Sequence, residues 1–162
     1  MNITKTQLVL KLFDSIVLIG PRQCGKTTEL LISAIIYAAE NPGHRIIIYS
    51  RYLRDLRVDQ VRDIYASIVS NVTCYKESRN RLIFSNGAEI RFAATENDIR
   101  GSGAEYFIID ADEWMTMKDL NICLPLLLAS KKMTIALFVG GKRPEIQEHI
   151  LALERIKCIL RL

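Results

Sequence analysis

The sequence predicts an α/β fold, a three-layer sandwich of helices around a mostly parallel sheet with an added β-hairpin. Short, nearly continuous apolar runs alternate with helical segments, which is typical of buried parallel strands. A glycine-rich loop joins the first apolar run to the first long helix, and an Asn-Gly dipeptide separates two strand-like runs in mid-chain. The 162 residues, 49% of them hydrophobic, suffice for one domain with a sheet covered on both faces.

The first elements follow from apolar periodicity. An amphipathic segment at 5–13 leads into a strand at 15–19 and then the glycine-rich loop. A helix that is apolar nearly all round follows from Thr28 to Glu40 and stops before the breaker Asn41-Pro42-Gly43. The pattern then predicts a buried strand at 45–50 and a helix at about 53–69.

The second half continues the alternation after a hairpin. The runs 81–84 and 89–92 flank Ser85-Asn86-Gly87-Ala88, and Asn-Gly is a strong hairpin signal. A polar loop at 95–103 is expected before the remaining elements. These are buried strands at 106–110 and 133–139, a helix at about 117–128 and a last helix from Pro144 onward.

The loop at residues 20–27 carries the strongest chemical signal. Its sequence, Gly20-Pro21-Arg22-Gln23-Cys24-Gly25-Lys26-Thr27, satisfies G-x-x-x-x-G-K-[ST] between a strand and a helix. Glycines let backbone N–H groups point at a phosphate, the lysine reaches the β and γ oxygens, and the threonine hydroxyl can ligate Mg²⁺. The pattern predicts that ATP and Mg²⁺ bind at Gly20 to Thr28; a chance glycine-rich turn is the alternative.

Asp110 is the second chemical feature, because it ends an apolar strand. A phosphate-loop enzyme needs an acidic residue on a neighbouring strand to hold Mg²⁺, directly or through water. Capping of the following segment is the alternative role. Hydrolysis also needs a group that orients the attacking water, yet the next residue is Ala111. The nearest carboxylates, Asp112 and Glu113, are alternatively solvated acids at a helix start.

Composition limits the remaining possibilities. The net charge of +4 permits a polyanionic partner without requiring one. The four cysteines are widely separated, which predicts neither a zinc site nor a disulfide framework and favours a reducing, intracellular compartment. The longest apolar stretch, 30–39, is too short to span a bilayer, so no membrane association is expected.

Several motifs together resemble a known family. The hairpin sequence from Asn80 to Phe92, the element Ile99-Arg100-Gly101 and the strand Tyr106 to Asp110 are similar to the ATPase domain of the terminase large subunit. That protein is the DNA-packaging motor of tailed phages and herpesviruses. Arg22 and Gln23 also fit its phosphate loop. The resemblance covers roughly Gln7 to Pro144 and implies a P-loop NTPase sandwich of the ASCE type.

The resemblance also implies roles for individual residues. Gln7 corresponds to the glutamine on the adenine side, Arg22 to the loop arginine that senses or stabilises the γ-phosphate, and Lys26 to the phosphate ligand. Thr27 and Asp110 correspond to the Mg²⁺-associated residues. The implied nucleotide contacts are Gln7, Gly20, Pro21, Arg22, Gln23, Cys24, Gly25, Lys26, Thr27 and Thr28.

Two positions depart from the family pattern. The catalytic glutamate usually follows the aspartate immediately, where this chain has Ala111, so Glu113 is the substitute candidate with Asp112 behind it. The coupling element after the following strand is usually rich in Ser or Thr, whereas this chain has Val139-Gly140-Gly141. The chain thus matches the family at the nucleotide-binding residues and departs from it at the positions of hydrolysis and coupling.

The resemblance extends to domains and partners. We expect a single ATPase domain at 1–162 without a nuclease domain, because the acids beyond its core, Glu145, Glu148 and Glu154, suit the solvated face of an amphipathic helix. Expected partners are double-stranded DNA, portal or capsid proteins and other terminase subunits, in a homo-oligomeric ring. Arg100 and Arg143 are candidates for an arginine supplied to a neighbouring subunit. The expected location is inside the host cell, in cytoplasm or nucleus, and transiently at the procapsid.

Two other classes of function stay open. One is a different phosphate-loop enzyme, such as a helicase-like ATPase or a small-molecule kinase, although no segment with paired arginines suggests a kinase lid. The other is a nucleotide-binding assembly or regulatory subunit with little turnover, which Ala111 and Gly140-Gly141 make credible. Phosphate release stimulated by duplex DNA favours the motor, phosphate transfer to a small acceptor the kinase, and binding without turnover the regulatory subunit.

Overall fold

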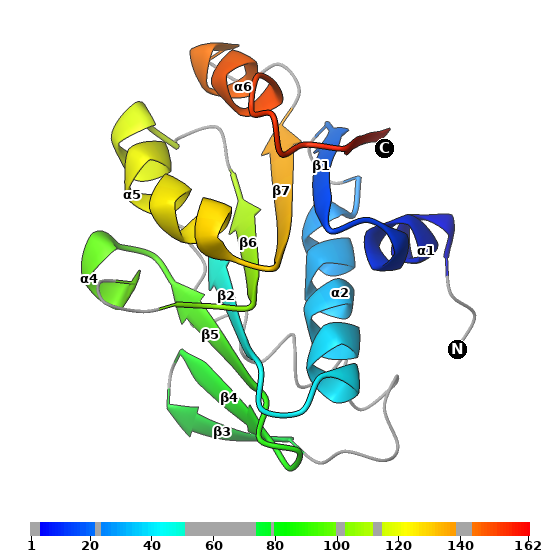
Figure 1. Cartoon of the computed structure of the whole chain (residues 1–162), viewed down its shortest axis with the longest axis vertical. Coiled ribbons are helices and arrows are strands. Elements are labelled where there is room, and N and C mark those ends of the chain that lie inside the picture. The colour runs from blue at the N-terminus through cyan, green and yellow to red at the C-terminus, as the bar shows by residue number, and fades with distance from the viewer. Residues whose placement is uncertain are drawn as a thin grey trace.

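The computed structural model describes residues 4–21, 24–50, 74–78, 80–99, 103–111, 115–138 and 144–162. Helices flank a twisted sheet on both sides (Figure 1). The elements within these ranges are α1 (Lys5–Leu12), β1 (Ser15–Gly20), α2 (Lys26–Glu40), β2 (Arg45–Tyr49), β3 (Cys74–Ser78), β4 (Arg81–Phe84), β5 (Glu89–Ala93), α4 (Glu96–Ile99), β6 (Tyr106–Asp110), α5 (Met117–Ala129), β7 (Lys132–Phe138), α6 (Pro144–Leu151) and β8 (Cys158–Arg161). No helix in these ranges is long and apolar enough to cross a bilayer.

The described strands form one eight-stranded sheet in the order β3-β4-β5-β2-β6-β7-β1-β8. From β5 to β8 along this order all neighbours are parallel, whereas β4 is antiparallel to both β3 and β5. The predicted parallel sheet with an added hairpin is therefore confirmed. One strand, β7, separates β1 from β6, which is the strand order of the ASCE type and brings the phosphate-loop strand and the Asp110 strand to a common edge.

Two apolar clusters, one on each face, hold the layers together. Alternate residues of a strand point to opposite faces, so Ile16 and Leu18 of β1 pack with α2 whereas Val17 and Ile19 pack with α5 and α6. All six residues of β1 are buried. The sheet is thus a rigid support for the loops at the carboxyl ends of its strands.

The predicted hairpin forms because Gly87 has a φ of 86°, which suits glycine in a tight turn. The Asn86 amide also donates to the carbonyl of Ala38 at 2.8 Å and so ties the turn to the end of α2. Beside the turn, Glu89 is buried and receives hydrogen bonds from Arg45 and Arg81. Burial raises the pKa of Glu89, but the two arginines lower it further, so its pKa lies below the usual value.

Four elements differ from the expectation. β3 and β8 are edge strands that sequence did not predict, and α4 lies within the predicted polar loop at 95–103. The last helix ends at Leu151, so Glu154 lies in a turn and not on the predicted helix. The chain has to turn there because the Lys157 N–H donates to the Ser15 carbonyl and β8 then pairs with β1. The predicted helix at about 53–69 lies outside the described residues.

Candidate functional site: the phosphate loop and the end of β6

The two chemical features of the sequence meet at the carboxyl edge of the sheet. Gly20, the last residue of β1, pairs with Phe138 of β7, and Asp110, the last residue of β6, pairs with Ala136 of β7. This register brings the Thr27 hydroxyl within 2.9 Å of Asp110 Oδ2, to which it donates a hydrogen bond. A hydroxyl and a carboxylate oxygen in contact are hard ligands of the kind that Mg²⁺ prefers, so the pair fits this ion.

The loop backbone is shaped to present N–H groups at the start of α2. Gly25 is the N-cap of α2 and lies in the left-handed region with φ of 87° and ψ of 9°. Glycine carries no side chain that could satisfy the first N–H groups of the helix. These groups and the positive end of the helix dipole favour an anion at this point.

Lys26 is folded inward against its own loop. Its side chain is buried, and Nζ donates to the carbonyls of Gly20 at 2.7 Å and Pro21 at 2.6 Å. Nζ also lies 3.5 Å from Cys24 Sγ and 5.7 Å from the centre of the Phe138 ring. A phosphate in the loop would have to draw the ammonium group away from these two carbonyls.

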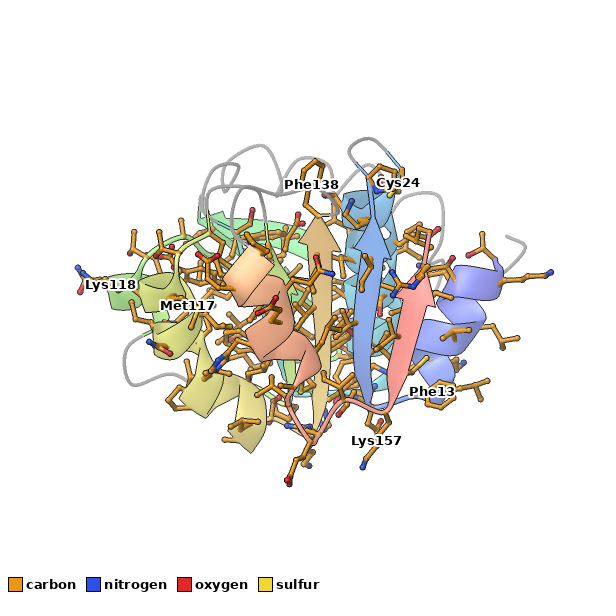
Figure 2. The ribbon with its side chains drawn as sticks, turned by 90° about the horizontal axis from the view of Figure 1, so that it is seen from above. Phe13, Cys24, Met117, Lys118, Phe138 and Lys157 are labelled. Atoms are coloured by element: carbon orange, nitrogen blue, oxygen red, sulfur yellow. The ribbon has the colours of Figure 1, made fainter. Side chains whose placement is uncertain are left out.

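Close packing inside the loop explains Gly20. A Cβ atom at this position would lie 2.6 Å from Cys24 Sγ and 3.2 Å from Leu162 Cβ. Figure 2 shows Cys24 and Phe138 close together at the same end of the sheet. Cys24 therefore fills the space beside Gly20, a packing role.

Gln7 of α1 contacts the first turn of α2 through Glu29. It is only 3% exposed, and its amide N–H₂ group donates to both the backbone carbonyl and the carboxylate of Glu29 on α2. Because both of these groups only accept, the orientation of the amide is fixed. Gln7 also lines a cavity of about 430 Å³ between α1 and α2, whose lining includes Lys132. The implied adenine contact of Gln7 remains a prediction.

A chain of buried hydroxyl groups ties the site helix to two strands of the sheet. The Tyr106 hydroxyl of β6 lies 2.9 Å from the Ser33 hydroxyl of α2 and 2.7 Å from the Thr134 hydroxyl of β7. Burial raises the pKa of Tyr106 to about 12, although both hydrogen bonds lower it. The phenol therefore stays protonated and fixes α2 relative to the strands that carry Asp110 and Phe138.

The residue after Asp110 cannot orient a water molecule. Ala111 is 7% exposed, packs in the core and donates its N–H to the Ala136 carbonyl at 3.0 Å.

The candidate acids Asp112 and Glu113 lie outside the described residues, as do Arg22 and Gln23 of the loop. Thr28 is exposed on the first turn of α2 and Pro21 is exposed in the loop.

The structure adds two residues that sequence reasoning missed. Phe138 contacts the Lys26 ammonium through its ring, and Glu29 holds Gln7. A strand-end phenylalanine resembles any core residue, so no sequence signal marks Phe138. Glu29 follows the Gly-Lys-Thr-Thr segment directly, but its long-range partner is visible only in the fold.

Residues 17–121 match the model of a protein family described as terminase large subunit, T4likevirus-type, N-terminal. No curated protein gives a significant sequence match.

Solved structures match over nearly the whole chain. The large terminase ATPase domain of Thermus phage P74-26 gives a TM-score of 0.69 at 15% identity, covering 98% of this chain and 80% of that one. The large terminase of another thermophilic bacteriophage gives 0.72 at 14% identity, covering 99% and 44%. The same terminase in complex with ATP-gamma-S gives 0.65 at 13% identity, again covering 99% and 44%. At these identities the matches show the shared fold, and this chain spans less than half of that second terminase.

Proposed function

This chain belongs to the terminase large-subunit family, and we propose that it is an ATPase that hydrolyses ATP to move double-stranded DNA into a capsid. The observation that carries the proposal is the contact of the Thr27 hydroxyl with Asp110 at 2.9 Å, directly beside the buried Lys26. These are the groups that a Mg²⁺–nucleoside triphosphate needs at one place. Solved terminase structures with ADP and with ATP-gamma-S lend further support, because both share this fold.

The roles follow from chemistry and position. The N–H groups at the start of α2 and the Lys26 ammonium bind the phosphates, and Arg22 is assigned to the γ-phosphate. Thr27 and Asp110 would hold Mg²⁺, and a bound Mg²⁺ would neutralise charge on the phosphate oxygens. Glu113 orients the attacking water in place of Ala111, with Asp112 as the second candidate. Gln7 is assigned to the adenine side.

Phosphate release in the presence and absence of duplex DNA tests the motor function directly. We expect duplex DNA to stimulate release, and Lys26→Ala to reduce affinity or turnover by at least about tenfold, because it removes a charge-assisted contact to the phosphates. Glu113→Gln should keep nucleotide affinity and lose most turnover, and Asp112→Asn is its matched control. Turnover that is unchanged by DNA, by Lys26→Ala and by Glu113→Gln would remove the motor proposal.

The ring is tested by mixing subunits. In a ring an arginine of one subunit stabilises the phosphoryl group bound by its neighbour. A Lys26→Ala subunit mixed with an Arg100→Ala or Arg143→Ala subunit should therefore recover part of the activity that each variant lacks alone. Full activity from a strictly monomeric sample would contradict the ring.

One observation favours a second function. Buried Ala111 leaves no carboxylate directly after Asp110, where the family usually has its catalytic glutamate. A subunit that binds ATP and regulates assembly without turnover has this property. ATP binding by calorimetry together with no phosphate release, with or without DNA, would support this second function and exclude the first.

A further inference from the structure

We propose that Phe138 is a positioning residue for Lys26: its ring holds the ammonium group in the inward position and so opposes its transfer to a bound phosphate. The inference rests on the proposed nucleotide site but concerns a residue outside the loop. Phe138 is the last residue of β7, and its backbone pairs with Gly20, whose carbonyl accepts a hydrogen bond from Lys26.

The strand geometry places the Phe138 ring on the face of the sheet that α2 covers. Alternate residues of a strand share a face, so Phe138 lies on the same face as Ala136 and Thr134. Ala136 belongs to the cluster that contacts α2, and Thr134 joins the hydroxyl chain that reaches Ser33 of α2. The ring therefore faces α2, whose first residue is Lys26.

The ring and the loop carbonyls act on the same ammonium group. The negative face of an aromatic ring attracts a cation within about 6 Å of its centroid, and the observed distance is 5.7 Å. Lys26 is 9% exposed, so water screens this attraction little. The two carbonyl contacts, at 2.7 and 2.6 Å, hold the same group in place. Each contact that is lost when Lys26 moves to phosphate reduces nucleotide affinity.

A double-mutant cycle tests the inference with ATP affinity as the readout. Phe138→Leu keeps an apolar side chain and removes the ring; we expect it to tighten ATP binding about threefold to tenfold, the size of a partly desolvated cation–π contact. Phe138→Tyr keeps the ring and should bind ATP like the unchanged protein. In the Lys26→Ala background Phe138→Leu should have no effect on affinity.

The outcomes separate this inference from the proposed function. If the unchanged chain binds no ATP, the proposed function fails. If it binds ATP but Phe138→Leu has no effect, weakens binding, or changes affinity equally with and without Lys26, only the role of Phe138 is overturned.

A second readout does not depend on the weak nucleotide binding of the Lys26→Ala protein. The rate at which an amine-specific acylating reagent modifies Lys26, measured by peptide mass spectrometry without nucleotide, should rise at least about threefold in Phe138→Leu, in line with the lost cation–π contact. The rate should not change in Phe138→Tyr. An unchanged rate in Phe138→Leu, with melting temperature as the control for folding, would overturn the proposal.

Discussion

Two glycines of the phosphate loop are required for different reasons. Gly25 has a φ of 87°, and a Cβ added there would meet no atom within 4 Å, so a side chain at this position encounters backbone strain alone. Gly20 has no positive φ, but its Cβ would lie 2.6 Å from Cys24 Sγ. A substitution at Gly25 therefore tests backbone strain, whereas a substitution at Gly20 tests a steric clash in the same loop.

We predict that Gly20→Ala weakens ATP binding and that Cys24→Ala in the same chain restores part of it, because the second change removes the colliding sulfur atom. Gly25→Ala should weaken folding or binding by about 1 kcal/mol, and Cys24→Ala should not restore it. Thermal unfolding and ATP titration measure both effects. Equal rescue of the two glycine variants would contradict the assignment.

The contact between Thr27 and Asp110 leads to a prediction about metal dependence. Asp110→Asn should reduce the gain in ATP affinity that Mg²⁺ provides by about tenfold or more, because a neutral amide attracts a cation less than a carboxylate. Affinity for ATP in EDTA should change little. Thr27→Val should act in the same direction, whereas Thr27→Ser keeps the hydroxyl and serves as the matched control. An undiminished Mg²⁺ effect in Asp110→Asn would remove the metal role.

At the scale of elements, α5 shows how a helix start is fixed near the site. Thr116 caps the helix by accepting from the Asp119 N–H, and the Asp119 carboxylate accepts from the Thr116 N–H in return, which forms a capping box. Asp119 also receives a hydrogen bond from Tyr49, the last residue of β2. The start of α5 is thereby tied to the carboxyl edge of the sheet.

We predict that Thr116→Ala destabilises the protein by about 1 kcal/mol and that Asp119→Ala costs more, because the second change also removes the partner of Tyr49. Thr116→Ser keeps the capping oxygen and should be nearly neutral. Chemical denaturation measures the differences. A Thr116→Ala protein as stable as the unchanged one would show that the cap contributes nothing.

Elements with strong local signals were predictable from sequence. The hairpin has Asn86-Gly87, the strand at 106–110 is apolar up to its final aspartate, and the phosphate loop has a specific pattern. β3 and β8 were missed because an edge strand is half exposed and needs no apolar run; β8 alternates between partly buried and exposed residues. Within the site, the contact of Thr27 with Asp110 was implied by chemistry, whereas the inward Lys26 and its Phe138 neighbour depend on packing that no local pattern encodes.

At the scale of the whole molecule, buried polar groups between the layers make the stability of the fold depend on pH. Tyr106 joins α2, β6 and β7 through two hydroxyl contacts, and the Lys132 ammonium lies 5.4 Å from its ring centre. Burial lowers the pKa of Lys132, whereas the pKa of Tyr106 is raised from 10.0 to about 12. The fold therefore favours the neutral phenol over its anion.

The sign of the pH effect follows from this shift. The unfolded chain releases the phenol proton near pH 10 and the folded chain only near pH 12. The stability that the Tyr106 hydroxyl contributes to the fold is therefore fully present below pH 10 and is lost as pH rises to 12. Two pH units correspond to about 3 kcal/mol.

We predict that Tyr106→Phe loses less stability than the unchanged protein between pH 10 and 12. Its stability at pH 7 should be lower by about 1–3 kcal/mol, because Ser33 and Thr134 each lose a partner. Phenylalanine keeps the ring beside Lys132, so the comparison isolates the hydroxyl group. Denaturant unfolding at several pH values measures both effects, and parallel pH profiles would contradict the prediction.

The order of the strands affects the sequence of events in which the chain folds. Thr27 and Asp110 are 83 residues apart, and β1 pairs with β7 and β8, which are synthesised long after it. Contacts between distant residues form slowly, and an N-terminal portion of the chain carries the phosphate loop on a strand whose edges are still unpaired. Magnesium nucleotide would stabilise only chains in which β7 already lies between β1 and β6. Magnesium nucleotide added during refolding should then raise the final yield of native protein without accelerating the early steps.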